Sequence, residues 1–256
     1  MGHLISLVKI MNEKIAVNIL REVKEVLDKH QIIFWLYRGS MLGAIRNRKF
    51  ILWDNDIDLC LKNVNSSRKQ LLCRDLKEKK FKVIQREKKD RNDGLIAIKN
   101  GCTVAMLIPF IDEQGFSLHY LIPNHKVGEF LDYLLWQARL RNLSYQSNMP
   151  DIITKILNCF FKKIPNNLRE KIVIILQIIY KKIDSYHVVE KIPRHLFEEL
   201  KVIDFYDMKI NIPTRAEEYA AYRYGKNWRQ PDKNFIYFRD AGTVVQKCKY
   251  GELLKK

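Results

Sequence analysis

Two aspartates separated by one residue, Asp56 and Asp58, are the side chains of this sequence whose spacing points most directly to metal chemistry. At the start of a strand, side chains two residues apart point to the same face, with their Cβ atoms roughly 6–7 Å apart. Two carboxylates in that arrangement can share one Mg²⁺, which prefers oxygen ligands. Ile57 then points the other way, into a core, which explains the apolar residue between the acids.

The segment before these acids predicts a phosphate site. Residues 32–37 form a continuous apolar run typical of a buried strand, and residues 41–45 return to helical spacing. We therefore expect Gly39 and Ser40 where a strand gives way to a helix N-terminus, whose backbone N–H groups can meet an anion. No Gly-x-Ser-x-Gly elbow surrounds Ser40, so its hydroxyl is interpreted as a phosphate ligand and not as a nucleophile. The pattern indicates a metal-dependent transferase acting on a phosphate-bearing donor.

Hydrophobic spacing predicts the elements that position these residues. Helices are expected over residues 14–29, 66–79, 126–140, 151–183 with a break near Pro165, and 215–224. Strands are expected over residues 32–37, 56–61, 81–84, 95–98, 104–108 and 116–121, with an extended segment at 208–212. We predict an α/β (α+β) fold in four parts: an N-terminal helical segment (1–31), a core (32–125), a helical region (126–204) and a C-terminal segment packing on the core (205–256).

The charge of the chain narrows its partners. Its 256 residues carry 46 Lys/Arg against 29 Asp/Glu, a net charge of +17, so nucleic acid, nucleotides and acidic membrane surfaces are the expected kinds of partner. Residues 61–100 hold 13 basic and 5 acidic side chains, a balance that a simple solvated face would also show. The five cysteines are scattered and lack C-x-x-C pairs, which predicts reduced thiols and argues against structural zinc.

The apolar segments predict a protein without a membrane span. No apolar run reaches about 18 residues, so neither a signal peptide nor a transmembrane helix is expected. Residues 172–179 are apolar on nearly all sides, which predicts a helix buried on more than one face. Lysines at positions 162, 163, 181 and 182 flank these apolar residues, so contact with a membrane surface stays open. We expect a cytoplasmic location, with peripheral contact at the inner membrane face as the alternative.

Three segments resemble the LicD family, which includes the fukutin-related proteins. Residues 38–46, Arg-Gly-Ser-Met-Leu-Gly-Ala-Ile-Arg, resemble that family's Gly-Thr/Ser-Leu-Leu-Gly-Ala-Val-Arg run. Residues 50–58 resemble its Phe-Ile-Pro-Trp-Asp-Asp-Asp-Ile-Asp, and residues 224–231 resemble its Tyr-Gly-x-x-Trp-x-x-Pro signature. The resemblance covers residues 15–232 and implies a nucleotidyltransferase-like mixed sheet flanked by helices, with a helical C-terminal addition.

The resemblance also implies a reaction: transfer of a phospho-group, such as phosphocholine or phosphoribitol, from a CDP-linked donor to a hydroxyl of a glycan or lipid-linked glycan. Such transfers modify cell-envelope polymers, including lipopolysaccharide and teichoic acid. The implied cofactor is Mg²⁺, with Mn²⁺ as the alternative, because a metal and an arginine neutralise the diphosphate and position its phosphorus. The candidate residues are Asp54, Asp56 and Asp58 for catalysis, the last two as metal ligands; Arg38, Gly39, Ser40 and Arg46 for the donor; and Trp53, Tyr224 and Trp228 for a substrate pocket.

Two positions depart from the family pattern. Asn55 replaces the middle acid of the triplet, and its side chain should point away from the acid pair. Met106 stands where family members commonly carry an Asp, in the strand before an Ile-Phe-Pro segment. A third carboxylate, serving as general base or further metal ligand, would then come from Asp112, or from Asp54 if the strand begins early enough to place it beside Asp56.

Other functions stay open from the sequence. The two tryptophans and the tyrosine of the candidate pocket can equally be core aromatics. Another nucleotidyltransferase-fold enzyme, acting on RNA or a small alcohol, would use residues 61–100 to follow a nucleic-acid backbone, but no aromatic-interleaved RNA platform supports it. A non-catalytic nucleotide- or glycan-binding relative would follow from the missing third acid. The sequence does not predict an oligomeric state.

Overall fold

The computed structural model describes residues 11–54, 56–86, 93–111, 114–123, 126–140, 151–182 and 186–249. The chain forms two compact units. The first consists of residues 1–119 and 190–245, and the second of residues 120–189 and 246–256. The four parts expected from the sequence remain a prediction. Asn55 and Asp112 lie outside the described residues.

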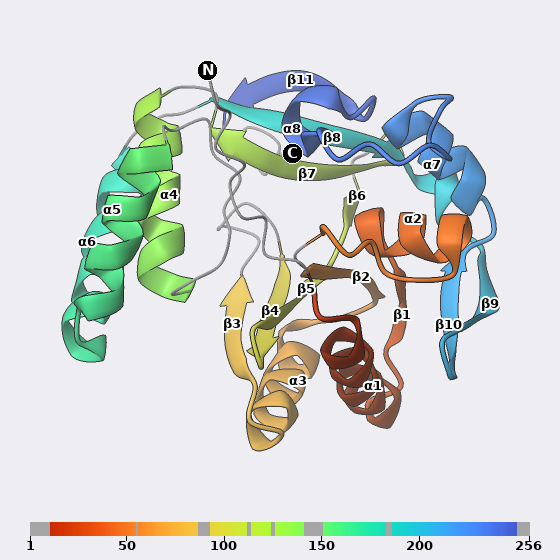
Figure 1. The fold of residues 1–256 in the computed structure, drawn as a ribbon, viewed down its shortest axis with the longest axis horizontal. Coiled ribbons are helices and arrows are strands. Elements are labelled where there is room, and N and C mark those ends of the chain that lie inside the picture. Colours follow the sequence, from red (N-terminus) through yellow and green to blue (C-terminus); the bar gives the residue numbers. More distant parts are fainter. Residues whose placement is uncertain are drawn as a thin grey trace. The chain divides into compact units, whose positions relative to one another are not determined.

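A five-stranded sheet in the first unit carries the aspartates (Figure 1). In spatial order its strands are β1 (Ile33–Leu36), β2 (Asp56–Lys62), β5 (Cys102–Leu107), β4 (Gly94–Lys99) and β3 (Lys82–Arg86). β2 and β5 run parallel, and the other neighbouring pairs run antiparallel. Helices α1 (Glu13–Lys29) and α3 (Ser66–Glu78) pack against each other and this sheet, and α2 (Arg38–Asn47) packs against β2. The predicted α/β fold, a mixed sheet flanked by helices, is confirmed.

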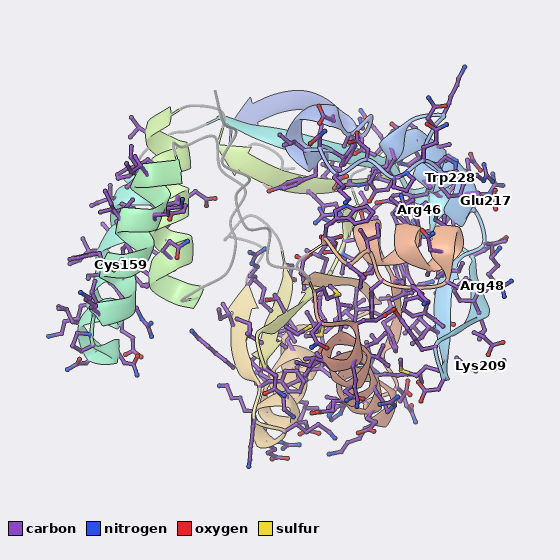
Figure 2. The ribbon with its side chains drawn as sticks, in the orientation of Figure 1. Arg46, Arg48, Cys159, Lys209, Glu217 and Trp228 are labelled. Atoms are coloured by element: carbon purple, nitrogen blue, oxygen red, sulfur yellow. The ribbon has the colours of Figure 1, made fainter. Side chains whose placement is uncertain are left out.

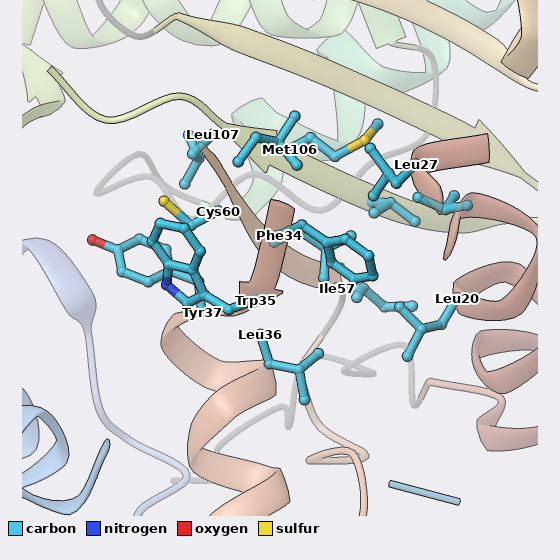
Figure 3. Packing of buried hydrophobic residues seen from close by; sticks show 14 of the residues in the cluster. Leu20, Leu27, Phe34, Trp35, Leu36, Tyr37, Ile57, Cys60, Met106 and Leu107 are labelled. Carbon is cyan, nitrogen blue, oxygen red and sulfur yellow. The ribbon is translucent and has the colours of Figure 1, made fainter. Parts of the chain in front are cut away.

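The register of β1, β2 and β5 sends side chains to two faces of the sheet. The face toward α1 is apolar and is built from Phe34, Leu36, Ile57, Leu59 and Met106, with Leu20 and Leu27 of the helix (Figure 3). The opposite face carries Trp35, Asp58, Cys60, Ala105 and Leu107. Asp56 shares this second face with Asp58, because strand side chains two residues apart point the same way. Both acids therefore lie on one face and Ile57 on the other, in agreement with the predicted alternation.

The C-terminal part of the first unit contains more strand than the sequence pattern predicts. β9 (Leu200–Phe205) and β10 (Met208–Pro213) form an antiparallel pair, and β10 lies beside β1. α7 (Ala216–Tyr224) follows β10 as predicted, and the short α8 (Tyr237–Asp240) comes later.

A second sheet has the order β11 (Val244–Lys249), β8 (Tyr186–Pro193), β7 (Phe116–Pro123) and β6 (Phe110–Ile111). Strands β6, β8, β9 and β11 were not predicted.

The second unit contains the helices α4 (Lys126–Leu140), α5 (Asp151–Lys163) and α6 (Asn166–Lys182). The break between α5 and α6 falls at Pro165, as predicted. A small core joins the three helices, with Ala138, Phe161 and Ile164 buried and Leu134, Ile172, Val173 and Leu176 packed against them. Among the described residues, none of the helices combines the length and the apolar character needed to cross a membrane.

The prediction that residues 172–179 are buried on more than one face is wrong. One face of α6 packs into the small core, while its other apolar side chains are exposed: Ile174, Ile175, Ile178 and Ile179. A three-helix unit offers each helix only one side on which to bury residues. The apolar excess of α6 is therefore left on the outside.

Candidate active site

Helix α2 begins directly after strand β1. Tyr37 is its N-cap residue, with extended backbone, and no side chain caps the helix. Arg38 has a φ of 45°, a left-handed conformation that is uncommon for residues other than glycine and is often found at functional sites. Gly39 and Ser40 lie within the first helical turn, at the junction of strand and helix where the sequence predicts them. Backbone N–H groups of a first turn have no partner within the helix, so this uncapped end can bind an anion.

Ser40 connects helix α2 to strand β2, which carries the acids. Its Oγ accepts a hydrogen bond of 3.0 Å from the backbone N–H of Asp58. The backbone N–H of Tyr37 donates to the carbonyl of Asp58, also at 3.0 Å. Ser40 is buried, so its hydroxyl has a structural role in setting the position of the acid. That it also binds phosphate stays a prediction.

The carboxyl group of Asp54 rests on the backbone of Gly39. A Cβ atom at position 39 would collide with Oδ2 of Asp54, so a larger residue here would displace that carboxyl group. Strand β2 begins only at Asp56, so strand alternation does not place Asp54 beside the acid pair. Asp54 reaches the pair by another route, through a side-chain hydrogen bond with Asp56.

The acid pair holds its protons more tightly than ordinary aspartates. Burial, followed by the charge of Asp54, raises the pKa of Asp56 to about 7. Burial, followed by the charge of Asp56, raises the pKa of Asp58 to about 7. Arg38 lowers both pKa values and Arg223 lowers that of Asp58, but they do not outweigh burial. A bound cation would relieve both the repulsion and the cost of burying charge.

The carboxylates at this site fit Mg²⁺ as a pair of ligands, and they do not form a complete protein cage around it. Across the part of the chain that the structure describes, no three His, Cys, Asp or Glu side chains are arranged to hold a metal ion. Mg²⁺ is commonly held by one or two carboxylates together with water and substrate phosphates. Asp56 and Asp58 supply two such carboxylates on one strand face.

Two buried arginines lie beside the acids and share one buried glutamate. Arg38 donates from Nη2 to Glu190 at 2.9 Å, and Arg223 pairs with the same carboxylate. Thr243 donates its hydroxyl to Glu190 at 2.7 Å. The Nε atoms of Arg38 and Arg223 are buried, and neither has a hydrogen-bond partner among the described residues. Buried donors without partners are costly, and phosphate oxygens are the acceptors that arginine favours.

A buried, neutral histidine, His119, supports the site. Nε2 of His119 lies 3.3 Å from the hydroxyl of Tyr37 and 3.1 Å from that of Ser117. Burial, followed by the charges of Arg38 and Arg223, holds the pKa of His119 well below its usual value. His119 therefore belongs to the network that supports the site.

Sequence reasoning missed Arg223, Glu190 and His119 as members of the site. Arg223 directly precedes Tyr224 of the Tyr-Gly motif, so its position beside a recognised motif was an unused signal. Glu190 is completely buried on a strand that was not predicted, between apolar Val189 and Ile192. An acid in such a β-rich run could have indicated a buried ion pair.

Arg46 lies away from the acid pair, at the opposite end of α2 from Arg38. Arg46 is eight positions after Arg38 in the helix, a rise of about 12 Å along its axis. The guanidinium carbon of Arg46 is 6.0 Å from the ring centre of Trp53, and Nζ of Lys233 is 5.3 Å from that ring. Trp53 is half-buried, so it presents an aromatic surface next to two cations.

The three aromatic candidates meet in one cluster beside α2. Trp228 is buried there with Leu42 and Ile51, and Trp53 and Tyr224 pack against it. Figure 2 marks Trp228 and Arg46. Burial raises the pKa of Tyr224, Arg223 lowers it, and Asp54 raises it further, so the charged groups of the site affect the ionisation of this hydroxyl. Trp228 is thus a core aromatic, whereas Trp53 and Tyr224 connect this cluster to the charged site.

The third acid is absent from β5 on the side that faces the site. Met106 pairs with Leu59 and points into the core toward α1 (Figure 3). The positions of β5 that share the face of Asp56 and Asp58 are Thr103, Ala105 and Leu107. Asp54 is the further carboxyl group that the described residues bring to the acid pair.

A mixed sheet that presents an acid pair beside the N-terminus of the preceding helix is typical of a nucleotidyltransferase-like domain. Residues 31–134 match the sequence profile described as LicD/FKTN/FKRP, nucleotidyltransferase domain. This region therefore carries the LicD/FKTN/FKRP nucleotidyltransferase domain that the motifs predicted, and such a domain indicates a transferase.

Comparison with solved structures gives weak similarities. The solution structure of the antibiotic-resistance factor ANT(2'')-Ia is 14% identical, with 66% of this chain and 93% of that chain covered and a TM-score of 0.33. The crystal structure of ANT(2'')-Ia in complex with adenylyl-2''-tobramycin is also 14% identical, with 65% and 97% covered and a TM-score of 0.31. No curated protein sequence matches the chain. The fold class therefore rests on the sheet and helices described above.

Proposed function

We propose that the protein is a Mg²⁺-dependent transferase that moves a phospho-group from a CDP-linked donor to a glycan hydroxyl, in the synthesis of cell-envelope or surface polysaccharides. The LicD/FKTN/FKRP domain match over residues 31–134 supports phospho-group transfer to glycans as the class of reaction. Phosphocholine and phosphoribitol are the head groups we propose to test.

The observation that supports the proposal is that the acid pair and the two buried arginines lie beside each other. Asp56 and Asp58 have raised pKa values and are suited to a divalent cation. Arg38 and Arg223 are suited to an anion, because each has a buried Nε without a partner in the described part of the chain. A diphosphate with its Mg²⁺ is a ligand that satisfies both.

In the proposed complex, Asp56 and Asp58 hold Mg²⁺, which supplies neutralisation of the diphosphate charge when it is bound. Arg38 and Arg223 donate hydrogen bonds to phosphate oxygens while Glu190 fixes their orientation. The N-terminus of α2 faces the same anion. Trp53 and Tyr224 form one wall of the substrate pocket beside Arg46.

The transfer exchanges one P–O bond for another. The hydroxyl oxygen of the glycan forms a bond to the phosphorus that carries the head group, and the bond from that phosphorus to CMP breaks. CMP leaves with the bonding electron pair. The hydroxyl proton passes to Asp54, which is half-buried and hydrogen-bonded to Asp56.

A second candidate is a non-catalytic nucleotide- or glycan-binding protein, because the site face of β5 carries Thr103, Ala105 and Leu107 and no acid. Such a protein would bind the same donor through the arginines without turning it over. An enzyme acting on RNA or a small alcohol is favoured only by the charge of residues 61–100.

The test is release of CMP from CDP-choline and CDP-ribitol, with Mg²⁺ and cell-envelope glycan, followed by anion-exchange chromatography. We expect wild-type turnover, a loss of about a hundredfold or more in Asp58→Ala, and retention of the fold by circular dichroism. Asp204→Ala is the matched control, since the Asp204 side chain is 75% exposed on β9. An active Asp58→Ala enzyme would refute the metal assignment. Binding of the donor without turnover would select the non-catalytic binding protein. Transfer to RNA would select the enzyme that acts on RNA.

A further inference from the structure

The outer face of α5 is apolar. Ile152, Ile156 and Phe160 recur at every fourth position and are 69%, 64% and 59% exposed. Phe161 of the same helix and Ile164, directly after its end, are buried in the small core. α5 therefore has more apolar surface than its unit can bury.

The outer face of α6 has the same character. Ile175 and Ile178 are 56% and 52% exposed, and Ile174 and Ile179 beside them are exposed as well. Helices α5 and α6 pack into one core together with α4, as Figure 1 shows, so their outer faces belong to one helical unit. Side chains of these helices project away from α4, and Cys159 is marked among them in Figure 2.

This concentration differs from the exposed apolar residues of the first unit. There, within the described residues, exposed side chains such as Val202 and Ile33 come from separate elements. Single exposed apolar residues are normal on a soluble protein, whereas rows of them along two helices that share one core mark an interaction surface.

The charge on these helices identifies the kind of partner. Residues 151–182 contain seven Lys/Arg against two Asp/Glu. Lys155, Lys163 and Lys171 have exposed side chains, and Lys171 lies one turn before the exposed Ile174 and Ile175. Lysine stems can lie along apolar surface while their ammonium groups reach anionic head groups. A second copy of the same face would instead bring like charges together.

We propose that the outer faces of α5 and α6 lie in the interface of an anionic lipid bilayer. α5 has 13 residues and α6 has 17, so they are about 20 Å and 25 Å long. The hydrocarbon core of a bilayer is about 30 Å thick, so these helices lie along the surface with isoleucines among acyl chains and lysines among phosphates. The inference is independent of the donor chemistry at the acid pair.

Cys159 provides a direct test, because it is exposed while Cys60, Cys73 and Cys102 are buried. The full chain, carrying Cys248→Ser, is labelled at Cys159 with an environment-sensitive fluorophore and mixed with phosphatidylcholine vesicles with or without phosphatidylglycerol. We expect a blue shift and about a twofold rise in emission with the anionic vesicles. A label on Lys209→Cys in a Cys159→Ser background is the control, since the Lys209 side chain is 71% exposed on β10 of the first unit.

A variant carrying Ile156→Ser, Phe160→Ser, Ile175→Ser and Ile178→Ser separates insertion from charge attraction. Its vesicle-bound fraction in a flotation assay should fall on the order of tenfold, with an unchanged circular dichroism spectrum. The matched control is Val202→Ser with Ile33→Ser, which removes apolar residues 60% and 49% exposed in the first unit and should leave binding unchanged.

Three results would overturn the proposal: no vesicle binding by the wild type, binding unaffected by the four serines, or a stable dimer in which the Cys159 label is shielded. Asp58→Ala should bind vesicles like the wild type. Loss of the proposed activity and loss of membrane binding are therefore distinguishable.

Discussion

Replacing Asp58 by asparagine should make the metal-free protein more stable. The substitution keeps the shape of a side chain that is only 8% exposed and removes a charge that is buried beside Asp56. Because the pKa of Asp58 is raised from 3.8 to about 7, the folded protein binds the proton more tightly than the unfolded chain. The stabilisation by that proton is present below pH 4, and it is lost as the pH rises to about 7 and beyond.

The size of the gain follows from this shift. One pKa unit corresponds to about 1.4 kcal/mol, so a shift of about three units corresponds to at most about 4 kcal/mol at pH 8. Part of this is shared with Asp56, and the amide must also be buried, so we expect a gain on the order of 2 kcal/mol. For a chain of this size that is a rise in melting temperature of about 4–8 °C.

The assay is thermal unfolding in EDTA at pH 8 and pH 5, for the wild type, Asp58→Asn and the surface control Asp204→Asn. The gain should be largest at pH 8 and smaller at pH 5, and the control should show none. Adding Mg²⁺ at pH 8 should stabilise the wild type more than Asp58→Asn. A variant no more stable than the wild type at pH 8, or a gain that does not change with pH, would show that the acid pair is not strained by its charge.

The other predictions concern the groups around the acid pair. Gly39→Ala places a Cβ against the Asp54 carboxyl group, so turnover should fall at least about tenfold with the fold retained, as measured by CMP release and circular dichroism. Glu190→Gln leaves two buried arginines without their counter-charge and should lower the free energy of unfolding by about 3–5 kcal/mol in urea titrations; an unchanged midpoint would contradict the shared pair. His119 has a pKa well below its usual value when folded, so the unfolded chain binds its proton more tightly and stability should fall as the pH drops below about 6.5. His119→Gln should remove that part of the pH dependence, and an unchanged curve would refute it.

Local pattern was sufficient for the parts of the site that lie close together in the sequence. The Asp56-Ile57-Asp58 alternation fixes which face each side chain takes, because strand geometry has a period of two. The strand-to-helix change around Gly39 was predicted in kind, although the helix begins at Arg38. Glycine at position 39 leaves room for the Asp54 carboxyl group, a contact that the local pattern does not reveal.

Distant parts of the site could not be predicted in this way. Glu190 lies 152 residues after Arg38, and its pairing with that arginine depends on how β8 joins the second sheet. Sequence periodicity predicts which residues prefer burial but does not identify their partners. The isoleucines of α6 show the same limit, since an apolar run predicts burial and the unit has too little core to provide it.

Isothermal titration with CDP-choline and CDP-ribitol, with and without Mg²⁺, tests whether the acid pair and the arginines bind a donor through a metal ion. We expect that one of these donors binds the wild type with Mg²⁺, that binding weakens on the order of tenfold or more without the metal, and that Asp58→Ala removes the effect of Mg²⁺. Arg223→Gln should weaken donor binding even with Mg²⁺ present, because it removes a buried phosphate donor. Equal affinity with and without Mg²⁺, or no affinity for either donor, would rule out metal-dependent binding of the donor at the acid pair.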